Sequence, residues 1–271
     1  MSDQPTAAPT SGRRKSSRGA HIAYGIVGVI GELLITLGVL LFGFLVWQLW
    51  WTDVQGNRAQ AEIVREIVRE TPPAPTAGAT KGAVKIAEPR RDAPPVLAQQ
   101  PHATTFATMQ GPRWDGEPER PISEGTDRAT VLDVLGVGHY EGTAMPGDIG
   151  NFAVAGHRTT YAKPFNRVAE LKKDDAVVVR TSTLDGGKGT DTWYVYRVVS
   201  TQIVAPTDVA VIAPVPSEPA AEPTKRMMTM TTCHPMFSAR ERYIVHLELD
   251  YWAPVSSGTP AELVEQTTAK G

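Results

Sequence analysis

The chain has 271 residues, a formal net charge of −2 and a hydrophobic content of 41%. This length suits one or two domains, and the near-neutral charge argues against nucleic-acid binding, which requires a basic patch or stripe. The one cysteine, Cys233, excludes an internal disulfide framework. An unpaired cysteine is most often a small buried hydrophobe, so a reactive role for Cys233 depends on its neighbours.

The N-terminal part of the sequence predicts a membrane anchor. Residues 1–21 form a basic tail, and residues 22–52 are apolar with Glu32 as the one charged side chain. As a helix the apolar stretch is long enough to cross the ~30 Å hydrocarbon core of a bilayer. Trp47, Trp50 and Trp51 lie at its end and the basic tail precedes it, which predicts a cytoplasmic N-terminus and an extracellular remainder. A cleaved signal peptide is the alternative, but its apolar region would span only about 7–15 residues.

The next two segments predict a spacer between the anchor and a globular domain. Residues 53–70 are expected to form a helical stem, because apolar side chains recur four positions apart and acidic and basic ones three apart. Residues 71–103 are rich in Pro and Ala without an apolar period, which is typical of an extended tether. A polar tail is expected over residues 253–271.

Residues 104–252 predict a mainly β domain. Short segments with β-branched and aromatic residues, bounded by Gly, Pro or Asp, indicate strands at 106–109, 151–155, 176–180, 193–199, 202–204, 227–232 and 243–249. Short helices are expected at 128–135 and 163–171. Seven or eight short strands with few helices favour a closed β-barrel over a parallel βαβ sheet.

Three side chains at strand ends could carry out acyl transfer. His157 follows one predicted strand, Cys233 ends another, and Arg240 and Arg242 stand before the last. A thiolate can attack a carbonyl, an imidazolium can protonate the leaving amine, and an arginine can stabilise the oxyanion. Each residue alone would more often be structural or solvated. We expect no metal or cofactor, because Cys233 and the adjacent His234 do not make a ligand set.

In combination, these motifs resemble the sortase family, and in detail its class E group from high-GC Gram-positive bacteria. The matching pieces are Gly138-His139-Tyr140, Gly142-Thr143-Ala144-Met145-Pro146-Gly147, Asn151-Phe152-Ala153-Val154-Ala155-Gly156-His157-Arg158-Thr159-Thr160, Thr231-Thr232-Cys233-His234-Pro235 and Arg242-Tyr243-Ile244-Val245-His246. The resemblance implies an eight-stranded sortase β-barrel with His157, Cys233 and Arg242 in the catalytic roles. Arg242 is preferred to Arg240 because the family's arginine directly precedes the final apolar strand.

The same resemblance implies substrate contacts from Tyr140, Thr232 and Arg158. Tyr140 matches a tyrosine associated with class E selection of alanine in a Leu-Ala-X-Thr-Gly sorting signal. The sequence departs from the family pattern at Met230, where Leu is expected, and at Glu141, where Pro is usual. The exchange at 230 conserves side-chain volume, whereas the one at 141 could alter the rim of the substrate groove.

The implied activity is that of a membrane-anchored transpeptidase. Cleavage between Thr and Gly of the sorting signal would form a thioacyl intermediate on Cys233, and an amine of a cell-wall peptidoglycan precursor would then accept the protein. The expected partners are secreted proteins bearing such a signal, that precursor and the lipid bilayer, but no nucleic acid. Alternatives are a pilus-polymerising sortase, an L,D-transpeptidase-like enzyme and a non-catalytic tethered adhesin.

Overall fold

The computed structural model describes residues 18–70, 84–182 and 191–268. The chain divides into two compact units, Met1–Leu49 and Trp50–Gly271, which are described separately. The first unit contains the start of α1 (Arg18–Glu70), whose apolar side chains there are exposed. Among the described residues this is the one helix long and apolar enough to cross a membrane, and it therefore fits the predicted anchor.

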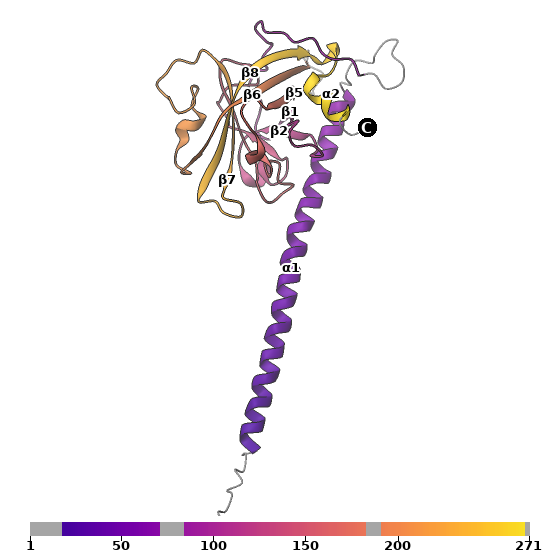
Figure 1. The fold of residues 1–271 in the computed structure, drawn as a ribbon, viewed down its shortest axis with the longest axis vertical. Helices are drawn as coiled ribbons and strands as arrows, with labels where there is room; N and C mark the ends of the chain where they lie inside the picture. The colour runs from indigo at the N-terminus through magenta and orange to yellow at the C-terminus, as the bar shows by residue number, and fades with distance from the viewer. Residues whose placement is uncertain (1–17, 71–83, 183–190, 269–271) are drawn as a thin grey trace, which may run out of the picture. The chain divides into compact units, whose positions relative to one another are not determined.

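The second unit is built around a closed barrel in the strand order β1-β2-β3-β4-β7-β8-β6-β5. The strands are β1 (Thr105–Gln110), β2 (Arg120–Glu124), β3 (Val137–His139), β4 (Gly150–Ala155), β5 (Ala176–Thr181), β6 (Thr192–Val204), β7 (Arg226–His234) and β8 (Glu241–Pro254). The long strands β6, β8 and β7 lie side by side (Figure 1). The eight-stranded barrel predicted from the sequence is confirmed.

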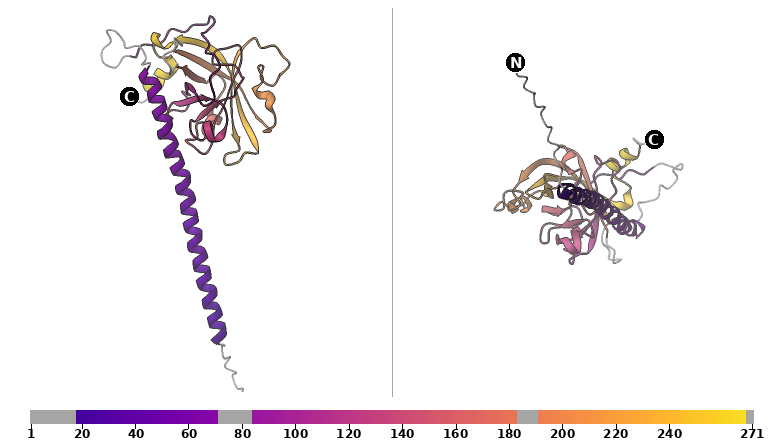
Figure 2. Two further views of the ribbon diagram at one scale, coloured as in Figure 1. Left: turned by 180° about the vertical axis from the view of Figure 1, so that it is seen from behind. Right: turned by 90° about the horizontal axis from the view of Figure 1, so that it is seen from below.

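Inward-facing apolar side chains fill the barrel, as alternation along a strand requires. Phe106, Phe152, Tyr196 and Met230 are among those with 2% exposure or less. Met230, where the family pattern has Leu, is thus a core residue. The loop between β6 and β7, orange in the figures, projects beyond the barrel wall (Figure 2).

The strand pairing decides which chain ends meet. β4 and β7 are parallel neighbours, so the residues that follow them leave the barrel at the same edge. β8 runs antiparallel to β7, which brings its first residues to that edge as well. The barrel therefore gathers the three segments that carry the predicted catalytic residues.

Some predicted elements differ from the structure. β2 and β3 were not predicted: β2 carries Arg, Pro, Ser and Glu yet is fully buried, and β3 is only three residues long. The two strands predicted at 193–199 and 202–204 are one strand, β6, with an irregular register near its middle. The predicted helices shorten to a π-helix, Arg128–Leu132, and a 3-10 turn, Val168–Glu170.

The predicted tether is wrong over residues 84–103, which lie against the barrel. Trp252 Nε1 donates to the carbonyl of Asp92 at 3.0 Å, and Tyr194 Oη donates to that of Pro95 at 2.6 Å. The prolines of this segment lack an N–H but keep their carbonyl acceptors, and Ala87 and Arg90 donate their backbone N–H groups to Thr259 and Trp252. Residues 71–83 of the expected tether lie outside the described part of the chain.

The polar tail expected from residue 253 is also folded in part. β8 continues to Pro254, and α2 (Ala261–Thr268) follows a 3-10 turn, Val255–Ser257. Leu263 of α2 is buried against the barrel, and the Glu262 carboxylate accepts hydrogen bonds from Tyr251 Oη and Arg197. A segment this short has no recognisable apolar period, so the sequence does not predict these contacts.

Candidate active site

An open cleft of about 630 Å³ lies at the barrel edge where the three segments meet. Its lining includes five of the six predicted site residues, namely Tyr140, His157, Thr232, Cys233 and Arg242. Cys233 is half-buried, so its thiol belongs to the cleft and not to the core.

The ladder between β7 and β8 sets the relation between the thiol and the arginine. Cys233 is the direct register partner of Arg242. Residues opposite each other in an antiparallel pair have Cβ atoms about 4.5–5.5 Å apart, which is within reach of an arginine head group. Arg240 precedes the start of β8 at Glu241 and has no partner in this ladder. Arg242 Nη1 donates to the carbonyl of Ala239 at 2.9 Å.

His157 lies in the loop after β4 and is held by two side chains. Its Nε2 is 2.6 Å from Asp133 Oδ1. An ionised carboxylate can only accept, so Nε2 carries a proton and donates to Asp133. The Tyr161 ring lies against the imidazole with 5.2 Å between ring centroids. The second ring nitrogen, Nδ1, is thereby left for proton exchange in the cleft.

Two hydroxyl groups connect the nucleophile strand to its neighbours. Thr232 Oγ1 donates to the carbonyl of Gly156 at 2.7 Å and so ties β7 to the segment that carries His157. Tyr140 Oη is 3.0 Å from Thr231 Oγ1. Tyr140 also lines an adjoining hollow of about 230 Å³ beside Arg242. Both Tyr140 and Thr232 therefore face space that a peptide can occupy.

Arg158 is placed differently from the other predicted residues. It is 7% exposed and does not line the cleft. Its Nη1 donates to the carbonyl of Cys233 at 3.2 Å and to His234 Nδ1 at 2.9 Å. Arg158 therefore holds the end of β7, and its contact with substrate stays a prediction.

A model of the sortase domain matches residues 112–250, which include every one of these site residues. The chain belongs to the sortase family. Sortase SrtE2 of Streptomyces coelicolor is 30% identical over 251 residues, covering 88% of this chain and 88% of SrtE2. Sortase SrtE1 of the same organism is 34% identical over 241 residues, covering 87% of this chain but 60% of SrtE1. This sortase thus spans less than two thirds of the length of SrtE1.

Solved sortase structures share the barrel. The SrtA sortase from Actinomyces oris superposes with a TM-score of 0.59 at 40% identity, covering 65% of this chain and 96% of that structure. Sortase E1 from Streptomyces coelicolor, determined with a tripeptide in its active site, has a TM-score of 0.52 at 35% identity, covering 61% and 99%. These similarities agree with the class E resemblance of the sequence.

Sequence reasoning missed three side chains at the site of this sortase. Asp133 and Tyr161 contact His157, and Phe237 lines the cleft although 80% of its surface is exposed. Asp133 was visible only as an acid within a predicted helix, and Tyr161 as an aromatic in a loop. Phe237 gave the clearest signal, because a large aromatic in a short loop after the nucleophile is seldom needed for packing.

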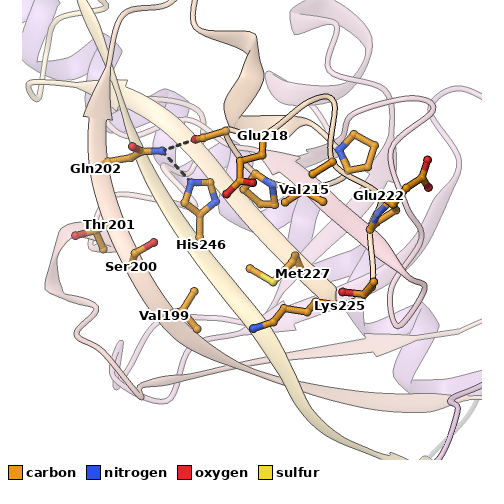
Figure 3. A pocket seen from close by; sticks show the side chains of 16 residues that line it. Val199, Ser200, Thr201, Gln202, Val215, Glu218, Glu222, Lys225, Met227 and His246 are labelled. Atoms are coloured by element: carbon orange, nitrogen blue, oxygen red, sulfur yellow. Dashed lines mark hydrogen bonds between the residues drawn. The ribbon is translucent and has the colours of Figure 1, made fainter.

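The sortase has a second cavity of about 570 Å³, between β6, β8 and the loop that precedes β7 (Figure 3). His246 borders it and is hydrogen-bonded to Gln202 Nε2 at 3.0 Å and to Thr229 Oγ1 at 2.9 Å. Burial lowers the pKa of His246 to about 4. The residues that line this cavity include no thiol; the register partner of His246 there is Ser200.

Within the described ranges, no group of three or more His, Cys, Asp or Glu side chains is arranged to hold a metal ion. The cleft presents a thiol, an imidazole with a carboxylate partner, and a guanidinium. These groups suit attack on an amide carbonyl.

Proposed function

We propose that this sortase is a membrane-anchored transpeptidase that cleaves a Leu-Ala-X-Thr-Gly sorting signal between Thr and Gly. The observation that carries the proposal is the register pairing of Cys233 with Arg242 at the mouth of a cleft that also contains His157. A nucleophile, an oxyanion donor and a proton carrier thereby border one space large enough for a peptide.

The reaction proceeds in two acyl transfers. The Cys233 thiolate attacks the threonine carbonyl, and Arg242 donates to the oxyanion of the tetrahedral intermediate. The C–N bond to glycine breaks, and His157 gives its proton to the departing amine. An amine of a second substrate then attacks the thioester, loses a proton to His157 and forms a new amide, which releases the thiolate.

The peptide is expected to bind along Tyr140 and the adjoining hollow. The occupied active site of Streptomyces sortase E1, which contains a tripeptide, supports peptide binding at the corresponding place. Tyr140 narrows the groove next to Arg242, which favours alanine over the bulkier, ring-constrained proline after the leucine. Thr232 supports this groove through its bond to Gly156.

The cellular arrangement follows from the apolar helix and the flanking charges. The N-terminus is cytoplasmic, the helix is a single-pass anchor, and the barrel is extracellular. Secreted proteins bearing the sorting signal are the acyl donors, and an amine-bearing peptidoglycan precursor is the acceptor.

The test uses the full chain in detergent micelles with Leu-Ala-X-Thr-Gly and Leu-Pro-X-Thr-Gly peptides and a panel of amines. Mass spectrometry should detect Leu-Ala-X-Thr on Cys233 and, with amine present, the corresponding amide product. Absence of acyl-enzyme and product from both peptides would reject the activity, while a preference for proline would reject the alanine-type signal. Ladders of linked substrate proteins would instead favour a pilus-polymerising sortase.

A further inference from the structure

The C-terminal part of α1 packs on the catalytic unit. We call residues 53–67 of α1 the stem; they belong to the same compact unit as the barrel. On one face of the stem Gln60 and Ile67 are 1% and 0% exposed, whereas Gln55, Arg58 and Ala59 on the other face are exposed. The stem is therefore docked along one side and is not a free spacer.

The first docking contact is with the loop that follows His157. A Cβ atom built on Gly56 would lie 3.0 Å from Ala162 Cβ, so the glycine allows the helix to approach this loop closely. Ala162 is fully buried, and Lys163 Nζ forms an ion pair with Asp53 Oδ2 at 2.8 Å. The stem thus covers the loop at two successive residues.

This loop has a strained backbone. Tyr161, Ala162 and Lys163 have φ values of 52°, 63° and 38°, in the left-handed region that residues with a Cβ disfavour. Such conformations persist only when the surrounding structure holds them. Tyr161 contacts the ring of His157, so any relaxation of the loop would reach the imidazole directly.

The second docking contact is with the turn that carries Asp133. The side-chain amide of Gln60 lies 2.9–3.1 Å from the position of a Cβ on Gly136, whose φ is +109°. Gly136 closes the turn after the π-helix through a bond from its N–H to the carbonyl of Val131. That turn includes Asp133, which accepts the hydrogen bond from His157 Nε2.

We propose that the stem positions His157 through both segments that hold its imidazole. Gly56 and Gln60 are its positioning residues, and the inference rests on the proposed role of His157. Displacement of the stem should lower kcat more than it changes KM, because neither contact involves Tyr140 or the strand pair of Cys233 and Arg242.

The docking itself is tested by a disulfide. In the full chain with Cys233→Ala, the pair Gly56→Cys and Ala162→Cys should oxidise, since the two Cβ positions are 3.0 Å apart and a small outward shift of the helix reaches the roughly 3.5–4.5 Å that disulfides need. The control pair Ala59→Cys and Ala162→Cys starts from the exposed face and should not. Equal oxidation of the two pairs, read by gel mobility under non-reducing conditions, would overturn the docked stem independently of any catalytic result.

The positioning role is tested by Gly56→Leu in the full-length enzyme. The added side chain cannot fit against Ala162, and kcat should fall about 10- to 100-fold with KM nearly constant, because small misplacements of a reacting group are costly. The matched control Ala59→Leu adds the same side chain on the exposed face and should stay within about twofold of the parent. Removing a glycine favours helix formation, so Gly56→Leu should not melt the stem itself.

Two further variants separate the possible failures. Full turnover in His157→Ala would reject the proposed mechanism, whereas the disulfide pair would still report the docking. Loss of turnover in His157→Ala together with equal kcat for Gly56→Leu and Ala59→Leu would reject the inference alone. If Gly56→Leu does not fold, Asp53→Lys should lower kcat and its combination with Lys163→Asp should restore it; a double variant as slow as the single one would overturn the proposal.

Discussion

The two halves of the active site are held by different means. Cys233 and Arg242 lie on adjacent strands, where a continuous ladder of backbone hydrogen bonds fixes their spacing. His157 lies in a loop and is held by side-chain contacts, with Asp133 from an earlier segment and with Tyr161 from the same loop. We therefore expect the strand-held half, Cys233 and Arg242, to tolerate substitutions elsewhere in the chain. The loop-held half, His157 with its contacts, should respond to substitutions far from the reacting atoms.

The largest effect is expected from the strand-held nucleophile. Cys233→Ala should lower kcat by about 10⁴-fold or more, because Cys233 is the one thiol of the chain and unactivated hydroxyl groups are far weaker nucleophiles. The thiol is half-buried in a cleft, so the melting temperature should change little. Peptide turnover measured beside a thermal melt checks both statements, and activity close to that of the parent would remove Cys233 from the mechanism.

The ladder also predicts which arginine matters. Arg242→Ala should reduce kcat about 10²–10³-fold, as loss of one oxyanion donor typically does. Arg240→Ala is the matched control, since Arg240 lies before β8 and opposite no residue of β7. A larger loss of kcat/KM in Arg240→Ala than in Arg242→Ala would mean that the strand pairing does not decide the oxyanion donor.

The loop-held half is probed at Asp133. Asp133→Asn keeps the shape but can present an amide N–H to Nε2, which disturbs the orientation and proton position of His157. We expect a decrease in kcat on the order of 10²-fold with KM little changed. Arg128→Gln is the control, because Arg128 Nε is 3.6 Å from the same carboxylate but does not contact His157. Equal kcat values for the two variants would contradict a positioning role for Asp133.

The sequence reveals the strand-held half more readily than the loop-held half. Thr231-Thr232-Cys233 and Arg242-Tyr243-Ile244 are continuous motifs on strands with clear β character, so their residues and their order could be predicted. The pairing of Cys233 with Arg242 could not be predicted, because Arg240 and Arg242 are two positions apart and strand alternation does not distinguish them. Only the pairing of β7 with β8 separates them.

No local sequence pattern predicts the environment of His157. Asp133 follows a π-helix whose register a 3.6-residue period does not describe, and Tyr161 has a left-handed backbone that its neighbours impose. The stem was predicted as a helix, but its docking was not. The docking involves Gly56, and a glycine inside a helix usually indicates lower helix stability. Tertiary contacts decided these features, and local propensity did not.

A selective effect is expected at Tyr140, which contacts the nucleophile strand through Thr231. Tyr140→Phe deletes the hydroxyl 3.0 Å from Thr231 Oγ1 and leaves the ring in the cleft. If Tyr140 recognises the substrate, kcat/KM for the alanine peptide should fall by an amount equivalent to about 1–2 kcal/mol of transition-state stabilisation. The fall for the proline peptide should be smaller. Comparison of the two peptides in both enzymes decides the matter, and an unchanged ratio would leave Tyr140 as scaffold.

The smallest effect on catalysis is expected at His246, which is the strand-held counterpart of His157. It lies opposite Thr229 in the same β7–β8 ladder. Gln202 Nε2 can only donate, so His246 Nε2 must accept, and Nδ1 donates to Thr229 Oγ1, which in turn donates to Asn151 Oδ1. The neutral imidazole satisfies every member of this network, whereas a second proton on Nε2 would face a donor.

This arrangement predicts a pH dependence of stability. The pKa of His246 is lowered from 6.5 to about 4 by burial, so between these values the unfolded chain binds more protons than the folded one. Stability should therefore be unaffected above pH 6.5 and should fall as the pH drops toward 4, by roughly 2 kcal/mol at pH 5. His246→Gln should flatten this slope in chemical denaturation at several pH values, with kcat at neutral pH nearly unchanged. An identical slope in the variant would assign the acid sensitivity to another group, and a lower kcat without a change in stability would make His246 part of the catalytic half.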